Sequence, residues 1–303
     1  MNPQISWPRK TREMHSHHFD STVWNDFEFR DDDIVIASFG KAGTTWMQQI
    51  VGQLVFRGAE DVPVSELSPW LDLRFPPKHV KFEGLKGQKN RRFIKTHLPV
   101  DALVFNPKVK YIYIARDGRD ILWSLYNHHA KGNEKWYEAL NGPGLVGEPV
   151  PRVEMDVVPY FRRWLARDGY PFWSLWENVR SWWAIRELPN VLLVHYANLK
   201  RDLSGEMQRV ARFLDIAIHE AEWPALIEHC TFDYMKKHAA NAAPLGGAIW
   251  EGGADSFIFR GTNGRWGDQL TEEDIEAYET RALKELGPEC AHWLESGEMS
   301  AAG

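Results

Sequence analysis

Four short runs of mostly apolar residues punctuate the chain, at residues 35–38, 93–96, 111–115 and 191–195. Each run is rich in β-branched or aromatic side chains and is bounded by charged or turn-forming residues, which predicts a β-strand. Because the runs are nearly continuous in apolar character, the strands are expected to be buried on both faces, as in a parallel sheet.

Apolar residues at helical spacing follow three of these runs, at residues 45–56, 119–129 and 204–214. Strands that alternate with helices predict an α/β fold, in which a central, mainly parallel β-sheet is flanked by helices on both faces. Thr271, with Asp274 three residues later, matches a helix cap, and a further helix is expected from there to about residue 286.

The chain has 303 residues, 44% of them hydrophobic, which suffices for one large core, and we expect a single domain over residues 1–303. Gly- and Pro-rich stretches at 141–150 and 243–253 have candidate site residues on both sides. We therefore interpret them as mobile segments over a cleft rather than as domain boundaries. Residues 1–16 and 296–303 are expected to be loosely ordered.

A formal net charge of -6 argues against a general nucleic-acid-binding protein. The N-terminal residues lack an apolar core of signal-peptide length, and no run approaches the roughly 18 apolar residues of a membrane span. We therefore expect a soluble protein without stable membrane insertion. The two cysteines, Cys230 and Cys290, predict no disulfide framework and fit a cytoplasmic location.

Three further groups of polar residues are interpreted as structural or solvent-exposed. They are the cluster His15, His17 and His18, the pair His128 and His129, and the acidic run Asp31, Asp32 and Asp33. No cysteine or carboxylate framework accompanies the histidines, so no metal site is predicted. The acidic run is expected to form a solvated turn before the first strand.

The most informative segment is the turn between the first predicted strand and its helix, FGKAGTTW at residues 39–46. A small-residue loop that leads into a helix exposes backbone N–H groups to an anion, which the helix dipole also favours. Gly43 lets the backbone approach a ligand closely, the following threonines add hydroxyl donors, and Lys41 adds a positive charge. The segment predicts a site for a phosphate-like group; the alternative is a Gly-rich turn without a ligand.

The residue order in this loop differs from the common nucleotide-binding pattern G-x-x-x-x-G-K-[ST], because Lys41 precedes Gly43. His97 and Arg116 also come directly after predicted strands. Ligands of α/β sheets bind beyond the carboxyl ends of the strands. Lys41, His97 and Arg116 are therefore expected to converge on one site despite their separation in sequence.

Several segments, in a matching order between residues 33 and 271, resemble the PAPS-dependent cytosolic sulfotransferase family, whose fold is P-loop-like. They are K-A-G-T-T-W at 41–46, K-T-H-L-P at 95–99, R-D-G-R-D at 116–120 with Ser124, and R-G-T-N-G-R-W at 260–266. The segment at 260–266 resembles bacterial members of the family more than animal ones. The resemblance implies binding of 3′-phosphoadenosine 5′-phosphosulfate (PAPS) through Lys41, Ala42, Gly43, Thr44, Thr45, Trp46, Arg116, Ser124, Tyr196, Thr231, Phe232, Phe259, Arg260 and Gly261.

The chain departs from the family pattern at Phe259, which stands where the family usually has Arg, and at Arg260, which replaces a Lys. The change at Phe259 removes one expected contact with the 3′-phosphate of PAPS. Arg260 or Arg265 could supply that contact, and the sequence does not distinguish between them.

The resemblance also implies catalytic roles. His97 is the expected base that removes the proton of the acceptor hydroxyl, and an imidazole with an ordinary pKa of about 6.5 suits this work near neutrality. Lys41 would neutralise the leaving oxygen of adenosine 3′,5′-bisphosphate (PAP), and Lys95 would hold the sulfuryl oxygens. Ser124 is expected to take part in catalysis as well as in PAPS binding. Because Lys and Arg supply the charge, no metal is expected.

Two other functions stay open: a nucleotide or metabolite kinase that uses ATP, and a non-catalytic protein that binds 3′-phosphorylated adenosine. Aromatic residues at 68–75 and 160–176 favour a phenol, a hydrophobic alcohol or a glycolipid as the acceptor. The four tryptophans at 173, 176, 182 and 183 are interpreted mainly as helix packing. The family's short dimer motif is not visible near the C-terminus, so a homodimer is left open.

Overall fold

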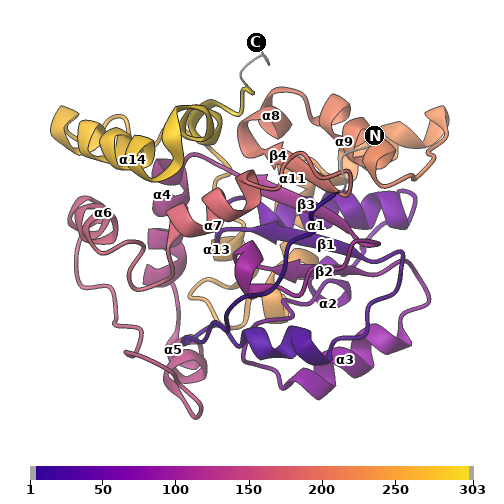
Figure 1. Cartoon of the computed structure of the whole chain (residues 1–303), viewed down its shortest axis with the longest axis horizontal. Coiled ribbons are helices and arrows are strands. Elements are labelled where there is room, and N and C mark those ends of the chain that lie inside the picture. The colour runs from indigo at the N-terminus through magenta and orange to yellow at the C-terminus, as the bar shows by residue number, and fades with distance from the viewer. Residues whose placement is uncertain (1–4, 300–303) are drawn as a thin grey trace.

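The structure is a computed structural model, which describes residues 5–299. At its centre lies a parallel sheet of four strands: β1 (Ile34–Ser38), β2 (Phe93–Thr96), β3 (Lys110–Ala115) and β4 (Val191–His195). The order across the sheet is β2-β1-β3-β4 (Figure 1). The chain leaves β1 toward one edge and then returns across it to β3. Such a reversal creates a crevice at the carboxyl ends of the strands, where α/β sheets bind ligands.

Helices cover both faces of the sheet, as the sequence predicts. The α-helices are α1 (Thr44–Val55), α2 (Val64–Leu67), α3 (Lys78–Gly87), α4 (Gly118–Ala130), α5 (Glu134–Asn141), α6 (Val157–Ala166), α7 (Leu175–Trp183), α8 (Tyr196–Arg201), α9 (Leu203–Phe213), α10 (Trp223–His229), α11 (Phe232–Lys237), α12 (Ala239–Ala242), α13 (Gly253–Phe257) and α14 (Glu272–Ser296). Short 3-10 helices are η1 (Ser21–Asp26), η2 (Val100–Ala102), η3 (Glu220–Glu222) and η4 (Pro244–Gly247).

Alternate residues of each strand enter two separate hydrophobic cores. Ile34 and Ile36 of β1 pack with apolar residues of α1, α9 and α10. Val35 and Ala37 pack on the other face, in a core shared with α4, α6, α7 and α14. In Figure 1 the first group of helices lies to the right of the sheet and the second to the left and above. All five residues of β1 are buried, which explains why the strand sequence is continuously apolar.

The helix expected to start at Thr271 does so, with the Thr271 hydroxyl and the Asp274 carboxylate capping each other's backbone N–H groups. The helical turns continue past the expected end at residue 286 as far as Ser296. They do so across a break at Gly287, whose φ of 74° is not helical and which is followed by Pro288. The predicted end is therefore a break between two helical segments that lie in one element.

Both ends of the described chain are attached to the body of the protein. The backbone N–H of Thr11 donates to the Asp101 carbonyl at 2.8 Å, and Arg12 forms ion pairs with Asp101 and Glu177. At the other end, the Asn198 side chain donates to the Gly297 carbonyl at 3.0 Å. These contacts differ from the loose order expected for 1–16 and 296–303; residues 1–4 and 300–303 lie outside the described part.

The acidic run before β1 is only partly the solvated turn that the sequence predicts. Asp31 and Asp32 are exposed, but Asp33 is completely buried. Its carboxylate accepts a hydrogen bond from Arg92 Nε at 2.7 Å, and Arg92 also donates to the Glu28 carbonyl. The expectation is therefore wrong for Asp33, because its partner lies 59 residues away in sequence.

The two Gly- and Pro-rich stretches differ in their relation to the rest of the chain. Residues 141–150 form a loop closed by two hydrogen bonds between the Asn141 side chain and the backbone of Val150. Residues 243–253 lead through η4 into α13 and carry Trp250, whose ring is buried.

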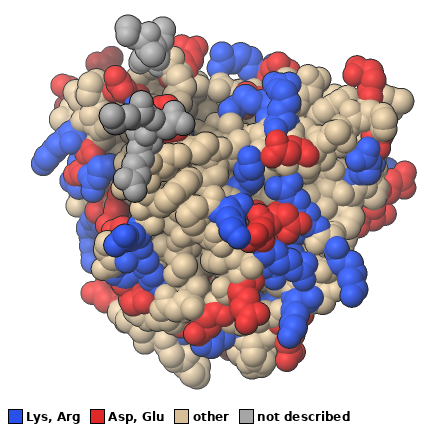
Figure 2. All heavy atoms as spheres, turned by 45° about the vertical axis from the view of Figure 1, so that its right-hand side comes forward, with Lys and Arg blue, Asp and Glu red and all other residues tan. Residues whose placement is uncertain are grey.

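On the face shown in Figure 2, acidic side chains lie among the basic ones. Within residues 5–299, no helix combines the length and apolar character that crossing a bilayer requires.

Replacing Arg92 by Met is expected to lower the free energy of unfolding by about 3–5 kcal/mol, because it leaves the Asp33 carboxylate buried without its partner. The matched control is Lys108→Met, which removes the exposed pair with Asp31 and should cost less than about 1 kcal/mol. Urea denaturation followed by circular dichroism measures both. Equal losses in the two variants would contradict the buried pair's structural role.

Candidate active site

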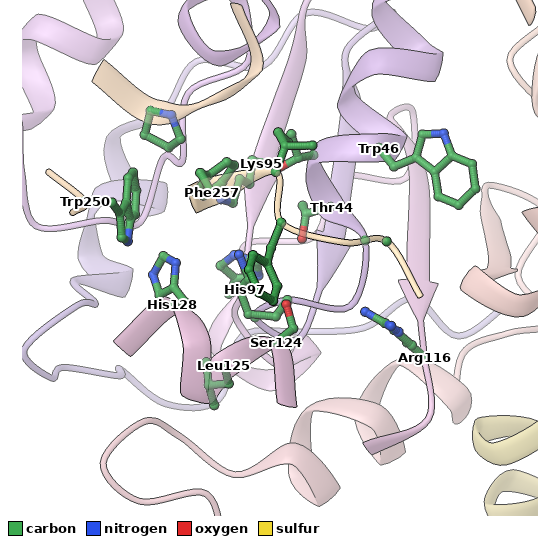
Figure 3. Close-up of a pocket in the computed structure, with 18 of the residues that line it drawn as sticks. Thr44, Trp46, Lys95, His97, Arg116, Ser124, Leu125, His128, Trp250 and Phe257 are labelled. Atoms are coloured by element: carbon green, nitrogen blue, oxygen red, sulfur yellow. The ribbon is translucent and has the colours of Figure 1, made fainter. Parts of the chain in front are cut away.

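A cavity of about 660 Å³ opens at the carboxyl ends of the strands. Each strand delivers a residue to its wall just beyond its end: Lys41 after β1, His97 after β2, Arg116 after β3 and Tyr196 after β4. The predicted convergence of Lys41, His97 and Arg116 is thus confirmed. In Figure 3, Trp46 and Arg116 lie at one end of the cavity, Trp250 and His128 at the other, and Lys95 and His97 between them.

The anion loop makes a tight turn between β1 and α1. Lys41 has a φ of 66° and Gly43 a φ of 112°, both in the left-handed region. A Cβ atom on Gly43 would lie 2.8 Å from Tyr196 Cδ2 and 2.9 Å from Ile114 Cδ1. Only glycine therefore fits here, because of the φ and the packing of Tyr196 and Ile114; close approach of a ligand stays a prediction. All predicted site residues except one line the cavity.

That exception is Ala42. Its side chain is completely buried in the hydrophobic core, and its backbone N–H donates to the Phe39 carbonyl at 3.3 Å. Its N–H is used to close the turn, so Ala42 shapes the loop from behind rather than facing a ligand.

His97 is joined directly to this loop through Ser38. Its Nδ1 lies 2.7 Å from the Ser38 carbonyl oxygen and 3.1 Å from the Ser38 hydroxyl, which in turn lies 2.6 Å from the Thr44 hydroxyl. A carbonyl can only accept, so Nδ1 of the neutral ring carries the proton and Nε2 is unprotonated. Burial and the nearby Lys95 lower the pKa of His97 well below its usual value. His97 is therefore neutral near pH 7, with a free lone pair.

Lys95 and the indole of Trp70 complete the wall beside His97. The Trp70 ring packs edge-on to His97 with centroids 4.6 Å apart, and Lys95 Nζ lies 4.9 Å from the centre of the Trp70 ring. Trp70 Nε1 donates to the buried Asp72 carboxylate at 2.7 Å. That carboxylate favours the charged form of Lys95 and so opposes the effect of burial on its pKa.

Positive charge collects around the anion loop. Burial, and then the charges of Lys95 and Arg116, lower the pKa of Lys41 to about 7. Burial lowers the pKa of Lys95 to about 8. Asp120 also lines the cavity, and it accepts a hydrogen bond from the Gly264 N–H. An anion bound between Lys41, Lys95 and Arg116 would relieve the repulsion among them, so these residues fit a phosphosulfate.

Arg116 holds the C-terminal Gly-rich loop in place. Its guanidinium donates to the Asn263 side chain and, at 2.7 Å, to the Thr262 carbonyl, and it lies 4.2 Å from the centre of the Tyr196 ring. Phe259, where the family usually has Arg, is 40% exposed. The guanidinium carbons of Arg260 and Arg265 lie 5.1 and 5.4 Å from its ring.

The remaining residues predicted to contact PAPS line the cavity near the anion loop. Trp46 packs edge-on to Tyr196 with centroids 5.1 Å apart and donates from its indole to the Cys230 carbonyl at 2.8 Å. Thr231 caps α11, and a Cβ on Gly261 would lie 2.6 Å from the Phe232 ring. This places the C-terminal loop directly against α11, although the two segments are far apart in sequence.

The other half of the cavity is aromatic and was only partly predicted. Residues of 68–75 and 160–176 do line it, namely Trp70, Leu73, Phe75, Phe172 and Trp173. Sequence reasoning missed His18, Trp123, His128, Trp136, Trp250 and Phe257, which line it from other elements. For α4, the helical spacing of Asp120, Ser124 and His128 gave a usable signal, since all three lie on one face.

Of the four clustered tryptophans, Trp173 is a wall residue, whereas Trp176 and Trp182 pack in the core as the sequence predicts. The Trp182 ring stacks on Tyr113 of β3 with centroids 5.4 Å apart. Among residues 5–299 no cluster of three or more His, Cys, Asp or Glu side chains is arranged to hold a metal ion.

Comparison with known proteins agrees with this geometry. The family model described as "Sulfotransferase domain" matches residues 31–287. A glycolipid sulfotransferase of Mycobacterium tuberculosis is 32% identical over 306 residues, which cover 92% of each chain. This chain belongs to the sulfotransferase family. Mouse sulfotransferase 1B1 is 29% identical over 271 residues, covering 86% of this chain and 85% of that one.

The fold of this sulfotransferase is shared with solved structures. A mouse sulfotransferase crystallised with PAP superposes with a TM-score of 0.68 at 23% identity, covering 90% of this chain and 92% of that one. Retinol dehydratase in a complex with retinol and PAP gives a TM-score of 0.68 at 24% identity, covering 88% and 84%. These findings confirm the predicted family, the P-loop-like α/β fold and the enzyme class.

Replacing Gly43 by Ala should weaken binding of PAP at least about tenfold, because a Cβ at this φ is strained and has no space. Isothermal titration calorimetry measures the affinity. Gly84→Ala is the matched control: Gly84 lies in α3 with no atom within 4 Å of its added Cβ, and PAP affinity should not change. An unaltered affinity of the Gly43 variant would contradict the role of this loop.

The affinity for PAP should fall as the pH rises through about 7, the value to which the pKa of Lys41 is lowered. Above that pH the free protein must take up a proton to charge Lys41 when the anion binds, and Lys95 adds to the effect in the same direction. Calorimetry between about pH 7 and pH 9, in buffers of different ionisation enthalpy, measures this proton uptake. Lys41→Arg keeps its charge and should show a weaker dependence; equal slopes would refute the assignment to Lys41.

Proposed function

We propose that this sulfotransferase moves the sulfuryl group of PAPS to a hydroxyl of an organic acceptor and releases PAP. The observation that carries the proposal is the bond network of Ser38, which ties the imidazole of His97 to the anion loop. The network leaves Nε2 of His97 free between a cluster of cations and an aromatic chamber. That arrangement suits removal of a proton from a hydroxyl that attacks an anionic donor.

The donor end is formed by groups that recognise anions and a flat base. The loop backbone, Lys41, Thr44 and Thr45 would hold the 5′-phosphosulfate. Arg116 and Ser124 would hold the 3′-phosphate. Arg265 is less exposed than Arg260. Burial, and then the charges of Arg260 and Arg116, lower the pKa of Arg265, which lies near Arg116. Arg265 is therefore the better candidate to supply the 3′-phosphate contact that the family usually makes with an arginine at the position of Phe259.

The adenine base would lie among three aromatic side chains. Trp46 packs against Tyr196, Phe232 lies beside Gly261, and all three aromatic rings line the donor end of the cavity. Stacking of a base on an aromatic side chain contributes roughly 1–3 kcal/mol where it has been measured by alanine substitution. Thr231, at the start of α11, completes this end.

The transfer itself is an in-line displacement at sulfur. The acceptor oxygen forms a bond to sulfur, His97 Nε2 receives its proton, and the bond from sulfur to the bridging phosphate oxygen breaks. Lys41 neutralises the charge that grows on that oxygen, while Lys95 and the loop N–H groups hold the sulfuryl oxygens. As in phosphoryl transfer, positioning and electrostatic stabilisation carry the catalysis.

The acceptor is proposed to be a hydrophobic alcohol, a phenol or a glycolipid. The aromatic half of the cavity supports an acceptor with substantial apolar surface, and mycobacterial relatives are named glycolipid sulfotransferases. We further propose that the chain acts as a single domain in the cytoplasm, without a metal and without a nucleic-acid partner. Whether it forms a homodimer stays a prediction to be measured.

Thermal unfolding with PAP, ATP and AMP at matched concentrations tests the donor. A ligand present at 100 times its dissociation constant adds about 2.7 kcal/mol, so stabilisation by PAP alone is the expected result. Stabilisation by ATP alone would replace this proposal with a kinase. Binding of PAP without transfer of labelled sulfuryl from PAPS to any acceptor would leave only a binding protein.

Replacing His97 by Ala should lower turnover by about 10²–10⁴-fold, because it removes the proton acceptor. Stabilisation by PAP should persist, since the anion loop is intact. His15→Ala is the control, because His15 is exposed and lies outside the cavity wall. Normal turnover of the His97 variant on a confirmed acceptor would refute the assignment of the base.

A further inference from the structure

His17 and His18 form part of the acceptor half of the site, although the sequence suggests a structural or solvent-exposed role. Both are buried, and His18 lines the cavity while His17 sits behind it. Their backbone is held by Arg74, whose N–H donates to the His18 carbonyl at 2.8 Å and whose Nε donates to the His17 carbonyl at 3.0 Å. The segment is thus fixed before any ligand binds.

The two imidazoles form a chain of hydrogen bonds, in which His18 donates to His17 and His17 donates to the Pro171 carbonyl. The Pro171 carbonyl can only accept, so His17 Nε2 carries a proton and donates to it. Neutral His17 then has a bare Nδ1, which lies 2.6 Å from His18 Nδ1. His18 must therefore donate from Nδ1, and its Nε2 is unprotonated. Burial lowers the pKa of both rings, which keeps them neutral near pH 7.

His18 Nε2 thus resembles His97 Nε2, the free nitrogen of the base. Within the described part of the chain no protein group is hydrogen-bonded to either nitrogen. The two rings border the same two indoles: His18 lies 5.7 Å from Trp70 and 5.6 Å from Trp173, while His97 lies 4.6 and 5.7 Å from them. The cavity wall therefore offers two hydrogen-bond acceptors in one neighbourhood.

An acceptor with a single hydroxyl would use only one of these nitrogens. It would exclude water from His18 and leave Nε2 without a donor, which costs free energy. A second donor group on the acceptor removes that cost. This group is better neutral than cationic, because Lys41, Lys95 and Lys135 also line the cavity and would repel an ammonium.

We propose that His18 is a specificity-determining residue, which accepts a hydrogen bond from a second hydroxyl of the acceptor. The preferred acceptors then carry neighbouring hydroxyl groups, as a catechol or a sugar ring does. This inference rests on the proposed function, because it assumes that His97 receives the proton of the first hydroxyl.

Matched acceptor pairs test the proposal. Transfer from labelled PAPS is measured on 4-octylcatechol against 4-octylphenol, and on octyl glucoside against 4-octylcyclohexanol. Replacing His18 by Phe keeps a ring of similar shape but removes both nitrogens. It should lower kcat/KM about tenfold for the polyhydroxyl member of a pair, which is the loss expected for one hydrogen bond. The kcat/KM for the single-hydroxyl member should change less than about threefold. The pair that responds identifies the catechol or the sugar as the acceptor type.

Two further variants separate recognition from folding. His18→Gln retains an oxygen that can accept a hydrogen bond and should keep part of the preference. His17 does not line the cavity, but it is the partner that fixes the His18 tautomer. Replacing His17 by Phe should therefore also reduce the preference for the polyhydroxyl acceptor. His15→Phe, at an exposed position outside the cavity, should change neither acceptor. Thermal stabilisation by PAP confirms that each variant is folded.

The outcomes distinguish the inference from the proposed function. If the wild-type protein transfers sulfuryl to 4-octylphenol but His18→Phe lowers both members of each pair equally, the role of His18 is overturned and the function stands. If PAP does not stabilise the wild-type protein and none of the four acceptors is sulfated, the proposed function fails and the inference fails with it.

Discussion

The hydrogen bonds of Ser38 are the constraint on which the geometry of the site depends. Ser38 is the last residue of β1 and is completely buried. Its hydroxyl meets Thr44 of the anion loop, and its carbonyl fixes the ring of His97 from the neighbouring strand. Because both partners are held from one point in the sheet, the position of the proposed base is coupled to that of the anion loop. In-line transfer needs this kind of alignment, in which small displacements are costly.

The two ends of the cavity follow different physical rules. At the donor end, burial and then the charges of Lys95 and Arg116 lower the pKa of Lys41 to about 7, so the site favours an anion. At the acceptor end, Trp70, Trp173 and Trp250 provide apolar surface, and the imidazoles of His18 and His128 lie in the same part of the wall. His97 lies at the boundary, where burial and cations keep it neutral.

The sequence predicted the sheet and the donor end well because their signals are local. The four strands agree with the structure to within one residue at either end, and Gly43 and Lys41 stand in a short motif that determines its own backbone. The acceptor end depends on packing between distant elements. His18 is placed by Arg74 and Pro171, and Asp33 is buried by Arg92. No pattern within one segment could show these partners. The burial of Ala42 in the core could not be predicted for the same reason.

Arg119 connects the end of the chain to the donor end of the site. Its guanidinium forms ion pairs with Glu279 and Glu295, which lie on either side of the break in α14, and it stacks 3.9 Å above the ring of Trp266 in the C-terminal Gly-rich loop. Glu295 is two residues from the C-terminal cap of α14. The last helical turn therefore supports the loop that we propose to bind the nucleotide. Under the proposed function, shortening the chain before Glu295, or fusing a bulky partner there, would weaken binding of the 3′-phosphate before it affects binding of the acceptor.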